Sequence, residues 1–154
     1  MSSSHTVETA HKYSRKRAIL WALLGVTLWV QVALKFRHPW VGAEVYSDRL
    51  EFWSVRLTWL VEIGLALLVL ATGGGLLLAR RVRALMNSEV TSRNRAQALI
   101  VGFWIAALAG LALSVVDAFR ALAADGAIAV LVSSSLGGAL LTFAWLEIRA
   151  DRDA

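Results

Sequence analysis

One acidic residue interrupts the long apolar stretches of this chain, and its chemistry is the most specific feature of the sequence. Glu62 lies in the run LTWLVEIGLALLVLATGGGLLLA, which covers residues 57–79. If this run forms a membrane helix, Glu62 lies ~9 Å from its centre at a rise of ~1.5 Å per residue, and therefore within the hydrocarbon. An ionised carboxylate at that depth is costly unless it is paired or hydrated, so Glu62 is a candidate functional residue.

Two other polar residues are expected at a comparable depth. Gln31 and Ser114 each lie in a different apolar run, and together with Glu62 they would form one polar layer. Such a layer could handle a proton or a cation. A structural interpretation is favoured over this one, because helical side chains tilt toward the helix N-terminus and Glu62 could reach a partner or the membrane interface. The candidate counter-charges are Arg37, Arg56 and Arg120.

The residue types that most catalytic and metal sites need are either missing from the chain or lie outside its apolar runs. The chain has no cysteine, which excludes disulfides, thiol catalysis and cysteine-ligated metal centres. Its three histidines, His5, His11 and His38, lie outside the apolar runs, which argues against a haem held between two helices. No metalloprotease, nucleotide-binding or serine-hydrolase motif occurs. The sequence therefore predicts no catalytic residue, no metal, no cofactor and no enzymatic activity.

Four helices must position these polar residues. Of the 154 residues 58% are hydrophobic, and the mean hydropathy is +0.61. Since soluble domains are nearer half apolar, an all-α integral membrane protein is predicted. No small-residue cleavage site follows the first apolar run, so that run is expected to remain as an uncleaved span. The expected organisation is a disordered basic tail (1–17), a transmembrane domain (18–146, with spans 18–34, 57–79, 97–116 and 126–146) and a short tail (147–154).

Basic residues are unevenly distributed between the segments that flank the spans. Residues 1–17, 80–96 and 147–154 hold 11 of the 16 lysines and arginines. Because basic loops accumulate in the cytoplasm, both termini are expected inside, with four transmembrane helices alternating up and down as an antiparallel bundle. This asymmetry also accounts for the net charge of +5 without a nucleic-acid partner. The expected contacts with anionic lipids are Arg80, Arg81, Arg83, Arg93 and Arg95.

Small residues mark the expected helix-packing positions. Gly102, Ala106 and Gly110 recur at intervals of four, so they share one helical face that lets another backbone approach closely in lipid. Gly73 lies in a run of three glycines, and Gly137 lies in the segment SSSLGG. The sequence leaves open whether the Gly102 face contacts another helix of the same chain or a second copy.

A further motif joins the basic loop to the third span. Its residues are Leu85, Met86, Asn87, Glu89, Thr91 and Arg95, followed by Gly102, Phe103 and Trp104. This segment resembles the corresponding stretch of a group of small, uncharacterised bacterial inner-membrane proteins. The resemblance implies a multi-pass protein of the bacterial plasma membrane, and it implies no activity.

Two functions are compatible with these features. The first is a structural or accessory component that packs with itself, as a homo-oligomer, or with a larger membrane complex. The second is a proton-coupled small transporter or channel subunit in which Glu62 carries the proton and Gln31 and Ser114 line the path. The two hypotheses differ in the role of the Glu62 carboxylate.

Overall fold

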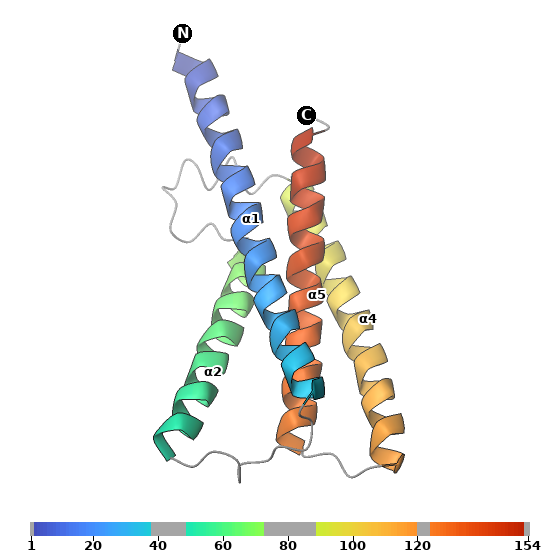
Figure 1. Cartoon of the computed structure of the whole chain (residues 1–154). Coiled ribbons are helices and arrows are strands. Elements are labelled where there is room, and N and C mark those ends of the chain that lie inside the picture. Colours follow the sequence, from blue (N-terminus) through green and yellow to red (C-terminus); the bar gives the residue numbers. More distant parts are fainter. Residues whose placement is uncertain (1, 38–48, 73–88, 120–123, 153–154) are drawn as a thin grey trace.

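The protein is all-helical over the residues that its computed structural model describes, which are 2–37, 49–72, 89–119 and 124–152. Successive helices run in opposite directions, so the start of α1 and the end of α5 lie at the same end of the molecule, called the terminal end below (Figure 1). The helices are α1 (Ser2–Arg37), α2 (Arg49–Thr72), α4 (Glu89–Phe119) and α5 (Ala124–Arg152).

Three of these helices are long and apolar enough to cross a membrane. The stretches concerned are Arg15–Leu34 in α1, Glu89–Asp117 in α4 and Gly126–Ala150 in α5. They contain the first, third and fourth predicted spans and support the prediction of a membrane protein. The second predicted span is described only as far as Thr72, where α2 ends, so its remainder, which includes Gly73, lies outside the described residues.

The N-terminal segment differs from the sequence prediction. Residues 1–17 were expected to be a disordered tail, but α1 begins at Ser2 and continues without a break into the first apolar run. The physical reason is local: residues 2–17 contain neither glycine nor proline, so nothing in this segment stops a helix that the apolar run already nucleates.

The other helices pack around α5. It lies between α1 and α4, and α2 contacts it more sparingly (Figure 1). Its small residues make this central position sterically feasible, because neighbouring backbones can approach on several sides. The ring of Phe143 stacks on Trp21 of α1 at a centroid distance of 4.7 Å. The buried core is completed by Leu28, Ala66, Leu70, Ala98, Ala139, Leu140 and Ala144.

Glycines lie at close contacts of α5 with α4 and with α1. A Cβ added at Gly102 would lie 2.9 Å from the Cβ of Ala139 and 3.0 Å from the carbonyl oxygen of Ser135, so α4 approaches α5 there. The Ser135 hydroxyl donates a hydrogen bond of 3.0 Å to the Gly102 carbonyl. The stripe that includes Gly102 and Gly110 therefore faces α5 within the chain.

The opposite side of α5 packs just as closely on α1. A Cβ added at Gly137 would lie 2.9 Å from Cδ1 of Trp29 and 3.1 Å from the carbonyl oxygen of Gly25. The next residue, Gly138, faces Ile105 of α4. Because successive helical residues are ~100° apart, adjacent glycines can serve two different neighbours.

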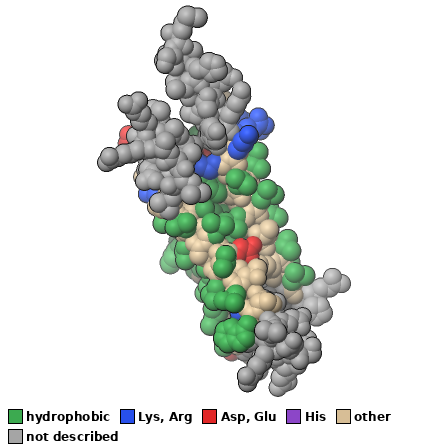
Figure 2. Space-filling view, turned by 90° about the vertical axis from the view of Figure 1, so that its left-hand side faces the viewer, with side chains coloured by type: hydrophobic (Ala, Val, Ile, Leu, Met, Phe, Trp, Pro, Cys, Tyr) green, Lys and Arg blue, Asp and Glu red, His purple; other side chains and the backbone are tan. Residues whose placement is uncertain are grey.

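Apolar side chains cover the outer surface of the described helices. On α4, the side chains of Phe103, Trp104 and Leu111 are all more than half exposed. Figure 2 shows hydrophobic side chains along the middle of one face, with lysine and arginine side chains gathered toward the terminal end. An exposed apolar surface of this extent is suited to hydrocarbon rather than water.

Candidate functional site

A hydrogen bond between side chains joins α1 to α2 within the apolar part of the molecule. Nε2 of Gln31 donates to Oε2 of Glu62, and both side chains are half-buried. One turn away on α2, Nε1 of Trp59 donates to Oγ of Ser133 on α5 at 3.0 Å. We call Gln31 and Glu62 the α1/α2 polar pair. The structure thus brings together two of the three residues of the predicted polar layer.

The third residue of that layer lies elsewhere. Ser114 is exposed on α4, and α4 makes hardly any contact with α2. In the described part of the chain, no hydrogen bond joins Ser114 to the α1/α2 polar pair. Of the candidate counter-charges, Arg56 has an exposed side chain, whereas the side chains of Arg37 and Arg120 lie outside the described residues.

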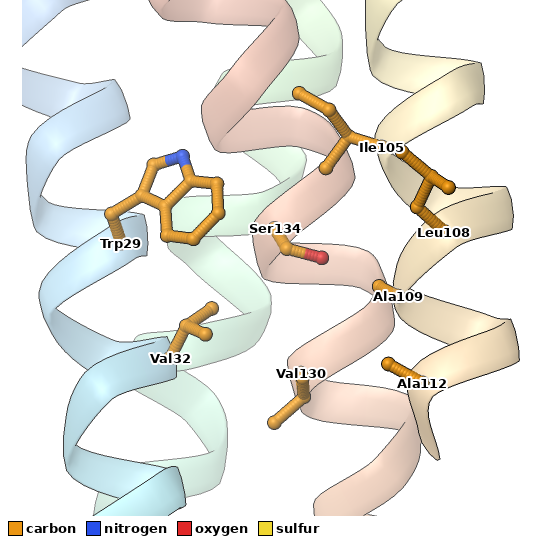
Figure 3. Close-up of a pocket in the computed structure, with 8 residues that line it drawn as sticks. All are labelled: Trp29, Val32, Ile105, Leu108, Ala109, Ala112, Val130 and Ser134. Carbon is orange, nitrogen blue, oxygen red and sulfur yellow. The ribbon is translucent and has the colours of Figure 1, made fainter. Parts of the chain in front are cut away.

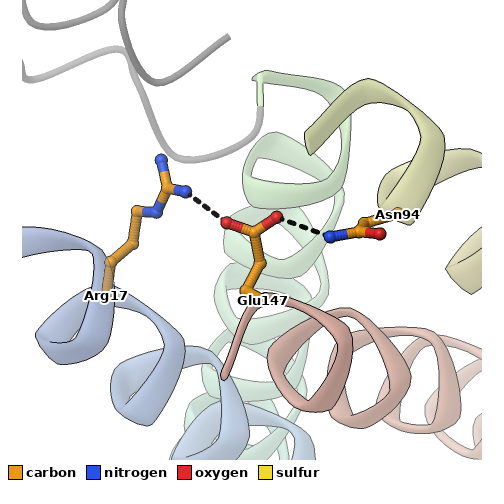
Figure 4. A network of polar contacts seen from close by, with 3 residues as sticks. All are labelled: Arg17, Asn94 and Glu147. Carbon is orange, nitrogen blue, oxygen red and sulfur yellow. Dashed lines mark hydrogen bonds and ion pairs between the residues drawn. The ribbon is translucent and has the colours of Figure 1, made fainter. Parts of the chain in front are cut away.

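A second polar cluster, at the terminal end, joins three helices (Figure 4). Glu147 of α5 accepts a hydrogen bond and ion pair of 2.8 Å from Arg17 of α1, and a second hydrogen bond of 3.1 Å from Nδ2 of Asn94 on α4. The side chains of Arg17 and Glu147 are only 11% and 6% exposed. The Arg17 guanidinium also lies 4.5 Å from the centre of the Trp21 ring. We call Arg17, Asn94 and Glu147 the three-helix polar cluster.

Sequence analysis missed the three-helix polar cluster. It counted Arg17 as one of several basic residues of a tail, placed Glu147 in the C-terminal tail, and gave Asn94 no role. A signal was nevertheless present: Arg17 immediately precedes one apolar run, and Glu147 immediately follows another. In helices that run in opposite directions these two positions lie at the same depth, so opposite charges at matched span ends could have been paired.

An apolar groove opens between α1 and α4 away from the terminal end (Figure 3). Its volume is about 290 Å³. The buried hydroxyl of Ser134 donates to the Leu131 carbonyl at 3.1 Å, so the one polar side chain in the lining besides the Trp29 indole is already satisfied. The other lining residues are Val32, Ile105, Leu108, Ala109, Ala112 and Val130.

The arginines predicted to contact lipid divide into three groups. Arg93 is exposed at the start of α4, where it is accessible from outside the helix bundle. Arg95 is half-buried and donates from Nη1 to the carbonyl of Ala71 at 2.9 Å, so it fastens α4 to the end of α2. Arg80, Arg81 and Arg83 lie outside the described residues.

Comparisons with known proteins do not supply a function. No protein-family model, curated protein or solved structure matches this chain. Among the residues that the structure describes, no three His, Cys, Asp or Glu side chains come together as they would around a metal ion. The α1/α2 polar pair and the three-helix polar cluster are the polar groups that the described helices bring together.

Proposed function

We propose that this chain is a four-span integral membrane protein with a structural or accessory role, packing with itself or with a larger membrane complex. Both termini lie on the cytoplasmic side of a bacterial inner membrane in this proposal. The three apolar helices support membrane insertion. The excess of basic residues in the segments at the terminal end supports the orientation. The sequence resemblance to bacterial inner-membrane proteins supports the location.

The proposed role is supported by the way in which the interior polar groups join helices. Glu62 accepts a hydrogen bond from α1, and Glu147 is paired with α1 and α4. Each carboxylate therefore joins helices to one another. Between them, the contacts are made by glycines and stacked rings that pack closely. Polar groups used in this way specify how helices assemble, which is the property expected of a packing component.

Basic residues at the terminal end extend the proposal to lipids. Arg93 is exposed beside the apolar part of α4, at the depth where a phosphate layer would lie if the orientation above holds. Anionic lipids of the inner leaflet are therefore proposed as partners of Arg93, together with Arg80, Arg81 and Arg83.

The mass of the extracted protein tests the proposal. We expect gentle detergent extraction from native membranes, followed by native mass spectrometry, to give a defined species heavier than one 16.8 kDa chain. Harsher detergent should reduce that species to the single chain, because contacts between apolar faces compete with detergent. A monodisperse single chain in every mild detergent would contradict an accessory role.

A proton-coupled transporter or channel subunit is the second candidate. The observation that favours it is the α1/α2 polar pair, which places a carboxylate with one neutral hydrogen-bond donor among apolar residues. Under this hypothesis, purified protein in liposomes carries a pH-dependent flux, and Glu62→Gln reduces that flux to the level of empty liposomes. Flux that is absent in the wild type, or unchanged in Glu62→Gln, eliminates the transporter hypothesis.

A further inference from the structure

The α1/α2 polar pair lies at the edge of the outer surface. On α2, the positions beside Glu62 on the outward side are Val61 and Leu65, whose side chains are 70% and 49% exposed. On α1, Leu34 lies one turn from Gln31 and is 58% exposed. The pair therefore occupies a seam between the two helices, flanked on both sides by exposed apolar residues. Figure 2 shows acidic side-chain atoms at the surface midway along such an apolar face.

The charge of Glu62 is incompletely balanced by the described part of the chain. Its hydrogen-bond partner, Gln31, is a neutral amide. Glu147 shows the contrast, because it lies against the guanidinium of Arg17. A nearby cation stabilises an ionised carboxylate in hydrocarbon, whereas a neutral donor satisfies its hydrogen bonding without offsetting its charge. The seam thus presents a negative group to whatever lies against it.

The spans of a second copy offer no cation at this depth. The spans 18–34, 57–79, 97–116 and 126–146 contain no lysine or arginine. A lipid ammonium group is also poorly placed, since Glu62 lies about 6 Å inside the edge of a ~30 Å hydrocarbon layer. A lysine or arginine within a membrane helix of another protein satisfies both the charge and the depth.

We propose that the seam between α1 and α2 docks a transmembrane helix of a different protein, whose lysine or arginine pairs with Glu62. This inference rests on the accessory role proposed above and gives the chemistry of its partner. Val61 and Leu65 of α2 and Leu34 of α1 provide the apolar contact, and the ion pair sets the depth of the partner helix. The partner is recognised by a basic residue near the middle of an apolar segment.

Site-specific photo-crosslinking in native membranes tests the docking site. A photoreactive amino acid at Leu65 is expected to capture a membrane segment that contains lysine or arginine at the matching depth, identified by peptide mass spectrometry. Glu62→Gln should lower the yield about tenfold, whereas Glu62→Asp, which keeps the charge, should retain most of it. The matched control Glu89→Gln alters an exposed carboxylate at the start of α4 and should leave the yield unchanged.

A second crosslinking position separates failure of the docking site from failure of the proposed function. Leu111 lies on the exposed face of α4, away from the seam. Capture of another protein at Leu111 but not at Leu65 would leave the accessory role standing and overturn the docking site. Capture at neither position, together with a single-chain mass, would overturn both. Retained thermal stability of Glu62→Gln is the folding control, since its amide oxygen still accepts from Gln31.

Three further outcomes at Leu65 would also overturn the docking site. The first is capture of lipid alone. The second is capture of a second copy, which differently tagged copies would reveal. The third is capture of a segment without lysine or arginine. When a basic segment is captured, Glu62→Lys combined with a change of the partner's cation to glutamate should restore the yield that either change alone removes. Failure of this reversal would show that the captured cation does not pair with Glu62.

Discussion

Replacing Glu147 with alanine is expected to destabilise the protein by about 3–5 kcal/mol, because removal of one member of a buried ion pair leaves the other charge buried and uncompensated. Arg17 is 11% exposed and would lose its 2.8 Å partner, and Asn94 would lose its acceptor. All three helices that meet at the terminal end would be affected. The measurement is the free energy of unfolding in mixed micelles, followed by the helical circular dichroism signal as denaturing detergent is added.

Two control variants distinguish loss of the ion pair from a general effect of removing charge. Glu89→Ala removes an exposed carboxylate from α4 and should change stability by less than about 0.5 kcal/mol. The double variant Arg17→Met with Glu147→Leu removes both charges together and should recover most of the loss, because buried ion pairs replaced by apolar residues are often neutral. A Glu147→Ala loss no larger than that of Glu89→Ala would show that the pair is not buried.

The position of a residue along its apolar run can be read from the sequence, whereas rotation about each helix axis cannot. Gln31, Glu62 and Ser114 were placed at a comparable depth from their positions in three apolar runs. The structure pairs Gln31 with Glu62 and leaves Ser114 exposed on α4. In a soluble helix, the apolar stripe would reveal which side faces inward. Lipid is as apolar as the interior, so these helices carry little such contrast and their rotation depends on packing.

The spacing of small residues indicated which helix faces pack closely, whereas the pattern of hydrophobic residues did not. The spacing of Gly102, Ala106 and Gly110 predicted a close-packed face, and the structure places that face against α5. The segment around Gly137 was also recognised as a packing element. The central position of α5 was not predicted, because it requires two adjacent glycines to serve two neighbours, and this depends on where α1 and α4 lie rather than on the α5 sequence.

The three-helix polar cluster could not be found by counting charges alone. Arg17 contributed to the basic excess that predicts orientation, and Glu147 slightly reduced it. The summed charge of a segment determines the electric field at a membrane surface, but it does not show which residues are paired. The cluster could have been sought by comparing the two ends of each span for opposite charges at the same depth. The sequence gives no comparable indication of the role of Asn94, because a single asparagine in a basic segment is common.

Gly137→Leu is expected to destabilise the protein by about 3 kcal/mol, because overpacking a filled contact displaces side chains and backbone. A Cβ at Gly137 would lie 3.1 Å from the backbone carbonyl of Gly25, and backbone cannot rotate away as a flexible side chain can. The larger leucine should therefore push α1 away from α5 and separate Trp21 from Phe143. The unfolding free energy in micelles measures the loss.

Gly64→Leu is the matched control, since it makes the same chemical change in α2 at a position where an added Cβ has no neighbour within 4 Å. Leucine has a higher helix propensity than glycine, so this variant should be neutral or more stable by up to ~1 kcal/mol. The difference between the two variants isolates the contact between helices from the intrinsic preference of the residue. Equal effects at Gly137 and Gly64 would mean that α1 and α5 do not cross at Gly25, and the central position of α5 would then lose its support.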